Sequence, residues 1–463
     1  MDDGRRDALL LLTILIGLFA LKHDTLDNPY YWDAMSGIID QSLSLLNNSL
    51  HPRVTGMWGH PPMQHYQIAV LWVLFGTSLP IAHTYILVVG AIGLFYTFKC
   101  GQVLFNSRVG YASMLLLLSS QIYFAQLGII NDSIPLATTG IMTFYYYLKK
   151  KKLAYVISAS VMLSTKETSG ILLLAICLHY FLEKTMKGGL SAGDYVNSLY
   201  LAIPLLPLLA WMGYIYGVKG WVFRTDLGLN RDVAGWIFAR NIIKYFIYDH
   251  TPQNVTRWNF IPTIFIILAL KRRRSLKALT LAMIVLLYNG LFALTQDIPR
   301  YYTPALPFYF MLAAYSMHSI IKSDKKYFLA IALMIGLSAT NFHGTRDSDG
   351  WMLESNMEYA DALENHAEGA RYLERQARFD RIITCWPMSE QLGEPMYGYV
   401  NKPVRNTQTI INQSGRTLVY YSRQSSCRHN PRYIALINGS RLLKRFERNG
   451  KLAEVYEMTQ SFP

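Results

Sequence analysis

Long apolar runs separated by short basic loops constrain this chain more than any other feature. The runs fill residues 1–341, whereas residues 342–463 are polar and contain no run long enough to span a bilayer. A transmembrane helix needs roughly 20 mainly apolar residues, with about 17 as a lower limit. We therefore predict an α-helical polytopic membrane domain over residues 1–341, followed by a small soluble α/β domain over residues 342–463.

The apolar runs predict about eleven transmembrane helices and a large first outer loop over residues 23–81. Residues 64–80 are also apolar, but we interpret them as a helix that lies in or dips into the membrane interface. A further span there would invert the orientation of every later loop. The predicted spans cover approximately residues 7–22, 82–99, 111–128, 133–148, 153–165, 169–182, 196–217, 258–270, 276–295, 303–321 and 326–341.

The positions of the basic residues predict the orientation. The chain has a net charge of +14, which in a soluble protein would suggest nucleic-acid binding. Here the Lys and Arg clusters, such as 149–152 and 271–277, fall in short loops between apolar runs. The positive-inside rule then places these loops in the cytoplasm and places the first loop and the C-terminal domain outside. We expect a multi-pass protein of the cell membrane with no nucleic-acid partner.

The C-terminal domain shows alternating helix and strand patterns. Residues 357–378 form an amphipathic helical stretch, and short apolar runs predict strands at 381–386, 417–422, 432–437 and near 453–458. Cys385 and Cys427 both lie in this domain and could form a disulfide if it is extracytoplasmic.

The stretch His23 to Met35, at the start of the first outer loop, places acids among aromatic residues. Asp24, Asp27 and Asp33 accompany Tyr31 and its aromatic neighbours. Aromatic residues of this kind favour the membrane–water boundary. Carboxylates at that depth suggest chemistry at the membrane surface, although these aspartates could instead only cap short helices.

Further ionisable and aromatic residues follow in later outer loops. Ionisable groups near a membrane are costly, and they usually pair or line a functional cavity. By topology these residues share one side, so they can converge. Simpler roles stay open: Lys166 and Glu167 could neutralise each other, Asp132 could cap a helix, Arg300 could anchor a span, and His60 could be a turn residue. The residues are Trp58, His60, Asp132, Lys166, Glu167, Arg300 and Tyr301.

Two cations and several acids on one side suit a phosphorylated lipid substrate. Arg300 could hold a phosphate in a bidentate manner and Lys166 as a point charge. A carboxylate could then act as general base on an acceptor hydroxyl. No metal ligands occur at a recognisable spacing, so we predict no cofactor, although Asp27 and Asp132 together could hold a divalent ion.

The order of these motifs resembles a known superfamily. An acidic first loop is followed by HPP at 60–62, an Asp before a span, a TK-containing loop at 165–166 and RYxxPxxP at 300–307. This order is similar to that of the GT-C integral membrane glycosyltransferases, and most similar to the protein O-mannosyltransferase and lipid A aminoarabinose transferase branches. The resemblance implies a polyprenyl- or dolichyl-phosphate sugar donor and a reaction on the outer face.

The resemblance also assigns roles. Asp27 matches the catalytic base, with Asp33 as its rival, and Asp132 matches the second catalytic aspartate. Lys166 and Arg300 match the residues at the donor phosphate, and His60 stands where the aminoarabinose branch tends to have Lys. The substrate-binding candidates are Tyr31, Trp58, Glu167 and Tyr301.

We therefore predict an inverting glycosyltransferase that moves a monosaccharide from a polyprenyl-phosphate donor to a protein, lipid or glycan acceptor. The alternative is a transporter or flippase for lipid-linked sugars. A transporter would place its functional groups near the bilayer midplane and would show two related halves.

Overall fold

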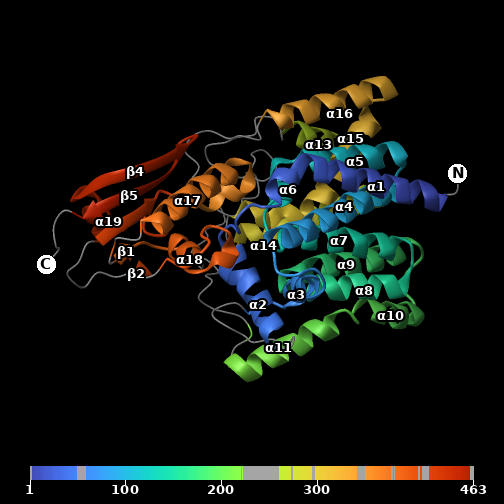
Figure 1. The fold of residues 1–463 in the computed structure, drawn as a ribbon. Helices are drawn as coiled ribbons and strands as arrows, with labels where there is room; N and C mark the ends of the chain where they lie inside the picture. The colour runs from blue at the N-terminus through green and yellow to red at the C-terminus, as the bar shows by residue number, and fades with distance from the viewer. Residues whose placement is uncertain are drawn as a thin grey trace.

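The computed structural model shows a helical bundle with a small sheet-containing domain at one end (Figure 1). The N-terminus lies at the opposite end of the bundle. The structure describes residues 3–48, 59–220, 222, 260–272, 275–294, 298–340, 350–376, 379, 381–404, 407–408 and 417–458.

Each predicted apolar run contains helix. The predicted interfacial segment forms α3, and residues after the first span form a short 3₁₀ turn (His23–Thr25) and a π-helix (Ala34–Ile39). The helices of the bundle are α1 (Asp3–Lys22), α2 (Asp40–Asn47), α3 (Met63–Phe75), α4 (Leu79–Leu104), α5 (Ser107–Ser119), α6 (Gln121–Gln126), α7 (Ser133–Leu148), α8 (Lys152–Leu163), α9 (Gly170–Met186), α10 (Ala192–Ser198), α11 (Leu205–Lys219), α13 (Phe260–Arg272), α14 (Leu276–Leu294), α15 (Leu306–Ile320) and α16 (Asp324–Ala339).

The count of eleven transmembrane helices is not confirmed. Among the described residues, three helices are long and apolar enough to cross a membrane: Gly4–Thr25, Leu79–Leu104 and Glu167–Met186. The pair Ala192–Leu201 and Leu205–Lys219, bent by 55°, would add a fourth span. Several other apolar helices are shorter, because breaks such as the one between α5 and α6 interrupt runs that the sequence shows as continuous.

Small residues let the central helices approach closely. A Cβ atom added to Gly101 of α4 would lie 2.8 Å from the Cα atom of Gly110 in α5, and one added to Gly93 would lie 2.4 Å from the hydroxyl of Thr138 in α7. Such contacts leave no room for a side chain. They hold α5 and α7 against α4, so the start of α7 has a defined position in the bundle.

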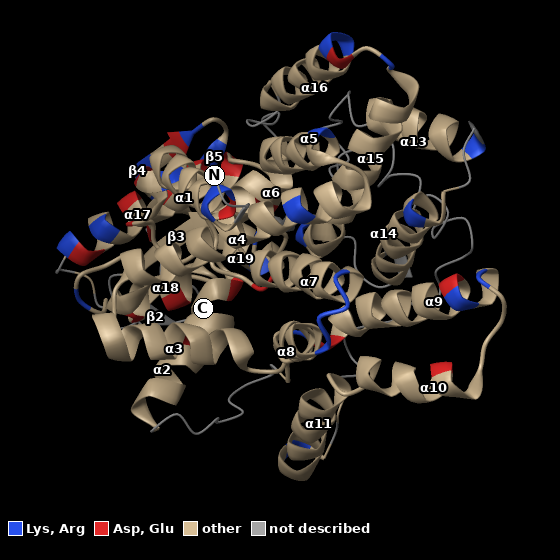
Figure 2. Ribbon diagram, turned by 90° about the vertical axis from the view of Figure 1, so that its right-hand side faces the viewer, with Lys and Arg blue, Asp and Glu red and all other residues tan. Residues whose placement is uncertain are grey.

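Lys and Arg gather at the helix ends that face away from the C-terminal domain (Figure 2). The turn between α7 and α8 carries Lys149 to Lys152, and its exposed lysines lie on this side. This distribution agrees with the orientation that the loop charges predict.

The C-terminal domain contains one mixed sheet with strand order β2-β1-β3-β5-β4. The first three strands pair in parallel, and β5 pairs antiparallel with β3 and β4. Helix α17 (Glu358–Arg375) packs on β4 and β5. The strands are β1 (Arg381–Ile383), β2 (Thr407–Gln408), β3 (Thr417–Ser422), β4 (Ser440–Arg448) and β5 (Lys451–Met458); two short helices, α18 (Met388–Gly393) and α19 (Pro431–Asn438), connect them.

The predicted strand at 432–437 is wrong, because these residues form helix α19. Asn430 caps this helix by accepting a hydrogen bond from the backbone N–H of Arg432, and Pro431 occupies its first turn. Both are helix-start signals that the apolar alternation of the segment obscured. The sequence analysis also missed β4, an edge strand with mostly exposed, charged residues.

The C-terminal domain and the bundle share one hydrophobic core. A single cluster of buried side chains contains Leu18 and Ile86 from the bundle together with Tyr420 and Val455 from the sheet. The added Cβ of Gly398 would lie 2.8 Å from the side chain of Leu79, so backbone and side chains of the two parts touch directly. The boundary near residue 341 therefore separates an apolar from a polar part of the sequence, but the two parts pack around one common core.

A disulfide joins Cys385 to Cys427, which are 42 residues apart. On the chain-entropy model, closing a loop of this length stabilises the fold by about 4 kcal/mol. We expect Cys385→Ser/Cys427→Ser to unfold at a clearly lower temperature than wild type in detergent. The matched control is Cys177→Ser, which removes a thiol that has no disulfide partner. Equal unfolding temperatures for the double variant and wild type, with and without reductant, would contradict this expectation.

Candidate functional site

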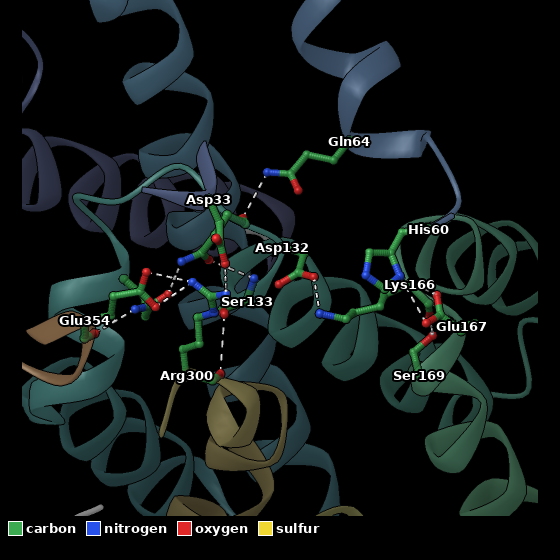
Figure 3. Close-up of polar contacts among 12 residues, drawn as sticks. Asp33, His60, Gln64, Asp132, Ser133, Lys166, Glu167, Ser169, Arg300 and Glu354 are labelled. Atoms are coloured by element: carbon green, nitrogen blue, oxygen red, sulfur yellow. Dashed lines mark hydrogen bonds and ion pairs between the residues drawn. The ribbon is translucent and has the colours of Figure 1, made fainter. Parts of the chain in front are cut away.

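Three groups of paired charges meet where the bundle joins the C-terminal domain (Figure 3). In the first group, Arg300 bonds to two carboxylates, those of Asp33 and Glu354. The other two groups are simple pairs, Asp132 with Lys166 and Glu167 with His60. Their members come from segments far apart in sequence, and every cation sits between helices rather than within a span. The structure thus brings together most of the residues that the sequence analysis selected.

Arg300 lies in the 3₁₀ turn Pro299–Ala305 that precedes α15 and is only 5% exposed. Its Nη1 donates to both carboxylate oxygens of Glu354, at 2.7 and 2.5 Å, and its Nη2 donates to Oδ2 of Asp33. One guanidinium therefore holds two carboxylates. Bidentate bonding of this kind fixes orientation as well as charge.

Lys166 lies between α8 and α9, and its Nζ donates to Oδ2 of Asp132 at 2.5 Å. Asp132 directly precedes α7, but its side chain does not cap that helix. The neighbouring Asn131 accepts the hydrogen bond from the Ser133 N–H instead. Asp132 is therefore free to face Lys166, and the simple capping role is not what the structure shows.

Polar residues around Asn131 hold the α7 start in place. Gln64 of α3 donates to the Asn131 carbonyl at 2.9 Å, and the Asn131 amide donates to Gln126. Gln126 in turn donates to the backbone carbonyl of Glu354 at 2.7 Å. One chain of hydrogen bonds thus connects helix α3, the Asp132 loop and the C-terminal domain.

Glu167 pairs with His60 rather than with its neighbour Lys166. Nδ1 of His60 lies 3.0 Å from each carboxylate oxygen of Glu167. The open possibility that Lys166 and Glu167 only neutralise each other does not hold in this arrangement, because each pairs across the site. His60 extends the charged cluster toward the start of α3.

Tyr301 places an aromatic ring beside both cations. Its ring centroid lies 4.6 Å from Nζ of Lys166 and 5.4 Å from Cζ of Arg300. Tyr301 also contacts Phe292 of α14, which packs on Tyr288 and Tyr302. Cation–π contacts of this kind stabilise positive charge where water is scarce, so the two cations share one aromatic support.

The backbone before Asp33 is strained. Trp32 has φ +40°, a conformation that large side chains rarely adopt. Its ring stacks on Tyr31 at 4.9 Å and meets Trp386 of the C-terminal domain edge-on at 5.5 Å. Strained residues persist only where their surroundings hold them. Packing by Trp386 thus helps to aim Asp33 at Arg300.

The charges of the pairs shift one another's pKa values. Burial raises the pKa of Asp132, but Lys166 and Arg300 lower it more, so the net shift is downward. Burial lowers the pKa of Lys166, and Asp132 more than offsets this effect. Burial raises the pKa of Glu354, the nearby Asp33 adds to the rise, and Arg300 only partly opposes it. Asp132 and Lys166 are thus charged near neutral pH.

Asp27 and Tyr31 do not join the charged pairs, and one member of the cluster was missed. Asp27 is exposed, and among the described residues no hydrogen bond or ion pair links it to Asp33, Asp132 or the two cations. Trp58 lies outside the described residues. Glu354 was not predicted, because it stands in the polar C-terminal part; its only signal is an acid in the apolar context WMLES at 351–355. Tyr31 lies beside Trp32 rather than in a charged pair.

Within the part of the chain that the structure describes, no three His, Cys, Asp or Glu side chains form a group suited to a metal ion. Asp132 pairs with Lys166, and among the described residues no contact joins Asp27 to Asp132. The expectation about cofactors stays a prediction.

Known proteins share this fold. A family model described as dolichyl-phosphate-mannose-protein mannosyltransferase matches residues 59–211, roughly a third of the chain. The crystal structure of ArnT from Cupriavidus metallidurans bound to undecaprenyl phosphate is 13% identical, covers 97% of each chain and has a TM-score of 0.56. Its apo form gives 12% identity, 98% of each chain and a TM-score of 0.57. The chain has the GT-C fold.

A weaker similarity links the chain to another GT-C protein. The archaeal oligosaccharyltransferase AglB from Archaeoglobus fulgidus, solved with an inhibitory peptide and a dolichol-phosphate, is 12% identical over 87% of this chain and 61% of its own, with a TM-score of 0.46. No curated protein matches this chain at a significant level. The superfamily expected from the motif order is confirmed at the level of the GT-C fold.

Proposed function

We propose that this protein is a glycosyltransferase that moves a monosaccharide from a polyprenyl-phosphate donor to an acceptor hydroxyl at the outer membrane surface, with inversion. The observation that carries the proposal is the convergence of Asp33, Asp132, Lys166 and Arg300 on one site of a GT-C fold. The family match and the ArnT relative, whose structure contains undecaprenyl phosphate, support the class of donor.

The proposed step is a direct displacement at the anomeric carbon. The acceptor oxygen forms a bond to this carbon while the bond from the carbon to the phosphate oxygen breaks, and its electron pair leaves with the lipid phosphate. Lys166 and Arg300, which share the Tyr301 ring, stabilise the charge on that phosphate. A phosphate leaving group needs no general acid, so one base suffices.

We propose Asp33 as the base that takes the proton of the acceptor hydroxyl. It is the first-loop carboxylate that reaches the cluster, and its side chain keeps 16% exposure. Arg300 bonds to Oδ2, which leaves Oδ1 for the acceptor. Asp27, the rival, is exposed and lacks a contact with the cluster among the described residues. Tyr301 and Glu167 are the proposed substrate contacts beside the phosphate.

The transporter alternative has less support. The charged pairs lie at the starts and ends of helices: Asp132 before α7, Lys166 after α8 and Arg300 before α15. A transporter site would lie near the middle of its spans, between two related halves. The two halves of the sequence also do not resemble each other.

The test is sugar transfer in purified membranes. We expect the wild-type protein to release one free polyprenyl phosphate for each labelled sugar transferred from at least one donor in a panel that includes mannose, glucose and aminoarabinose. Membranes without the protein serve as control. Movement of lipid-linked sugar across vesicles without release of polyprenyl phosphate, with acceptors from a cell extract present, would favour the transporter and overturn the proposal.

A further inference from the structure

The charged cluster contains more acids than bases. Asp33, Asp132 and Glu354 contribute three carboxylates, whereas Arg300 and Lys166 contribute two permanent cations. Glu167 and His60 add one further acid and one group that is charged only when protonated. A site that binds an anionic lipid phosphate would thus begin with a deficit of positive charge.

Both terminal nitrogens of Arg300 are already bonded to carboxylates when a phosphate approaches. Only Nε lacks a partner among the described residues. A phosphate that approaches Arg300 would be the third anion at one buried guanidinium. Like charges held at low dielectric repel strongly, so binding requires that one carboxylate leave or become neutral.

Glu354 is the carboxylate most suited to become neutral. It is 1% exposed, whereas the side chain of Asp33 is 16% exposed and can stay hydrated. The charged groups that act on Glu354 are Arg300, Asp33 and Asp132.

Among the described residues, Glu354 forms an ion pair with no cation other than Arg300. Helix α6 supplies the neutral amide of Gln126, which bonds to the Glu354 backbone, and the first loop supplies the phenol of Tyr31. On α17 the acid Glu358 already pairs with Lys451. Burial and the charge of Asp33 raise the pKa of Glu354 above its usual range.

We propose that Glu354, contributed by the C-terminal domain, is part of the donor-phosphate site and takes up one proton when the phosphate binds. This inference rests on the proposed function. The proton comes from hydronium or a buffer acid in the solvent: the donor's bond to hydrogen breaks as an O–H bond forms on the carboxylate, and no other covalent bond changes. Arg300 then turns its Nη1 from Glu354 to the phosphate oxygens, and the neutral acid donates its new O–H beside them. The proton leaves again with the lipid phosphate.

The sign of the pH dependence follows from this exchange. Bound phosphate adds negative charge near Glu354 and raises its pKa further, so the complex binds more protons than the free protein. Binding therefore tightens as the pH falls between the two pKa values of Glu354, by up to about tenfold per pH unit. At a pH above both values the carboxylate stays charged and binding is weakest.

The experiment measures the affinity of the full chain in detergent for geranylgeranyl methyl phosphate between pH 6 and 9. This probe is a phosphodiester, so its single charge does not change in this range. We expect the wild-type affinity to rise as the pH falls, and Glu354→Gln to bind at every pH about as tightly as wild type does at pH 6. Glu364→Gln, which makes the same change at an exposed residue of α17, should follow wild type. His60 is present in all three proteins, so any pH dependence that comes from His60 is common to them and cancels when the variants are compared with wild type.

Calorimetry on the wild-type protein gives a second measurement that does not need a variant. Titrations in two buffers of different protonation enthalpy should show uptake of up to one proton per bound probe, and none for Glu354→Gln. Binding without pH dependence and without proton uptake would overturn this inference and leave the proposed function intact. A folded wild-type protein that binds no probe at any pH would overturn both.

Discussion

Asp33→Asn is expected to lower the rate of sugar transfer by about 10³-fold to 10⁴-fold, at the upper end of what a general base contributes. Asp27→Asn, the same change six positions earlier in the same loop, should lower it by less than about threefold. Both variants change an aspartate to an asparagine, so they differ only in the position of the lost carboxylate. Asp33 reaches Arg300, whereas Asp27 is exposed.

An asparagine at position 33 keeps the shape of the side chain but cannot accept the proton of the acceptor hydroxyl. It can still accept a hydrogen bond from Arg300, so the cluster should keep its geometry. Because one carboxylate charge at Arg300 is removed, the affinity for polyprenyl phosphate should not fall. The loss should therefore fall on kcat rather than on KM for the donor. A base acts on the acceptor and not on the lipid phosphate.

The measurement is initial transfer rate in membranes with matched amounts of folded protein, together with the affinity for polyprenyl phosphate. Loss of activity in Asp27→Asn with activity kept in Asp33→Asn would move the base to Asp27 and leave the enzyme class unchanged. Equal small losses in both variants would show that neither carboxylate is the base.

Hydropathy predicts the helices well because apolar length is a local property. The run at 133–148 coincides with α7, and the interfacial interpretation of 64–80 corresponds to α3 at Met63–Phe75. Helix ends were harder to predict. The break at Ser120, between α5 and α6, falls in the polar triplet at 119–121, which is too short to end the apolar run at 111–128.

The partners within the site could not be predicted, because pairing depends on how helices pack. Lys166 and Glu167 are neighbours in sequence, and their obvious partners were each other. Close packing of small residues in α4 and α7 sets the position of Asp132. In that position its Oδ2 lies 2.5 Å from Nζ of Lys166. Loop charge predicts that these residues share one side of the membrane, but it does not predict which of them pair.

Glu354 is a second feature of the site that the sequence did not predict. The sequence separates into an apolar and a polar part, and this division suggested that chemistry belongs to the first part alone. The structure packs both parts in one core and places Glu354 on Arg300. Composition predicts where a domain begins, but it does not predict which of its side chains reach back into the neighbouring domain.

Arg300→Met is expected to lower both stability and binding of polyprenyl phosphate. Removing one partner of a buried ion pair costs about 3–5 kcal/mol, because the remaining charge stays buried without compensation. Here two carboxylates, Asp33 and Glu354, lose their shared partner. Arg300→Lys should recover little of the loss, because an ammonium group cannot bond to both carboxylates through a planar fork.

Lys451→Met separates the loss of stability from the loss of binding. It breaks a buried ion pair with Glu358, in which the lysine and glutamate side chains are 1% and 3% exposed. This pair shares no member with the ion pairs of Arg300 and Lys166. We expect similar destabilisation from Lys451→Met, with donor affinity unchanged in the protein that stays folded, whereas Arg300→Met should weaken donor binding at least about 100-fold. Unfolding in detergent and binding of polyprenyl phosphate are the two measurements. If both variants bound the lipid as wild type does, Arg300 would be a structural residue alone, and the phosphate site would have to be sought around Lys166.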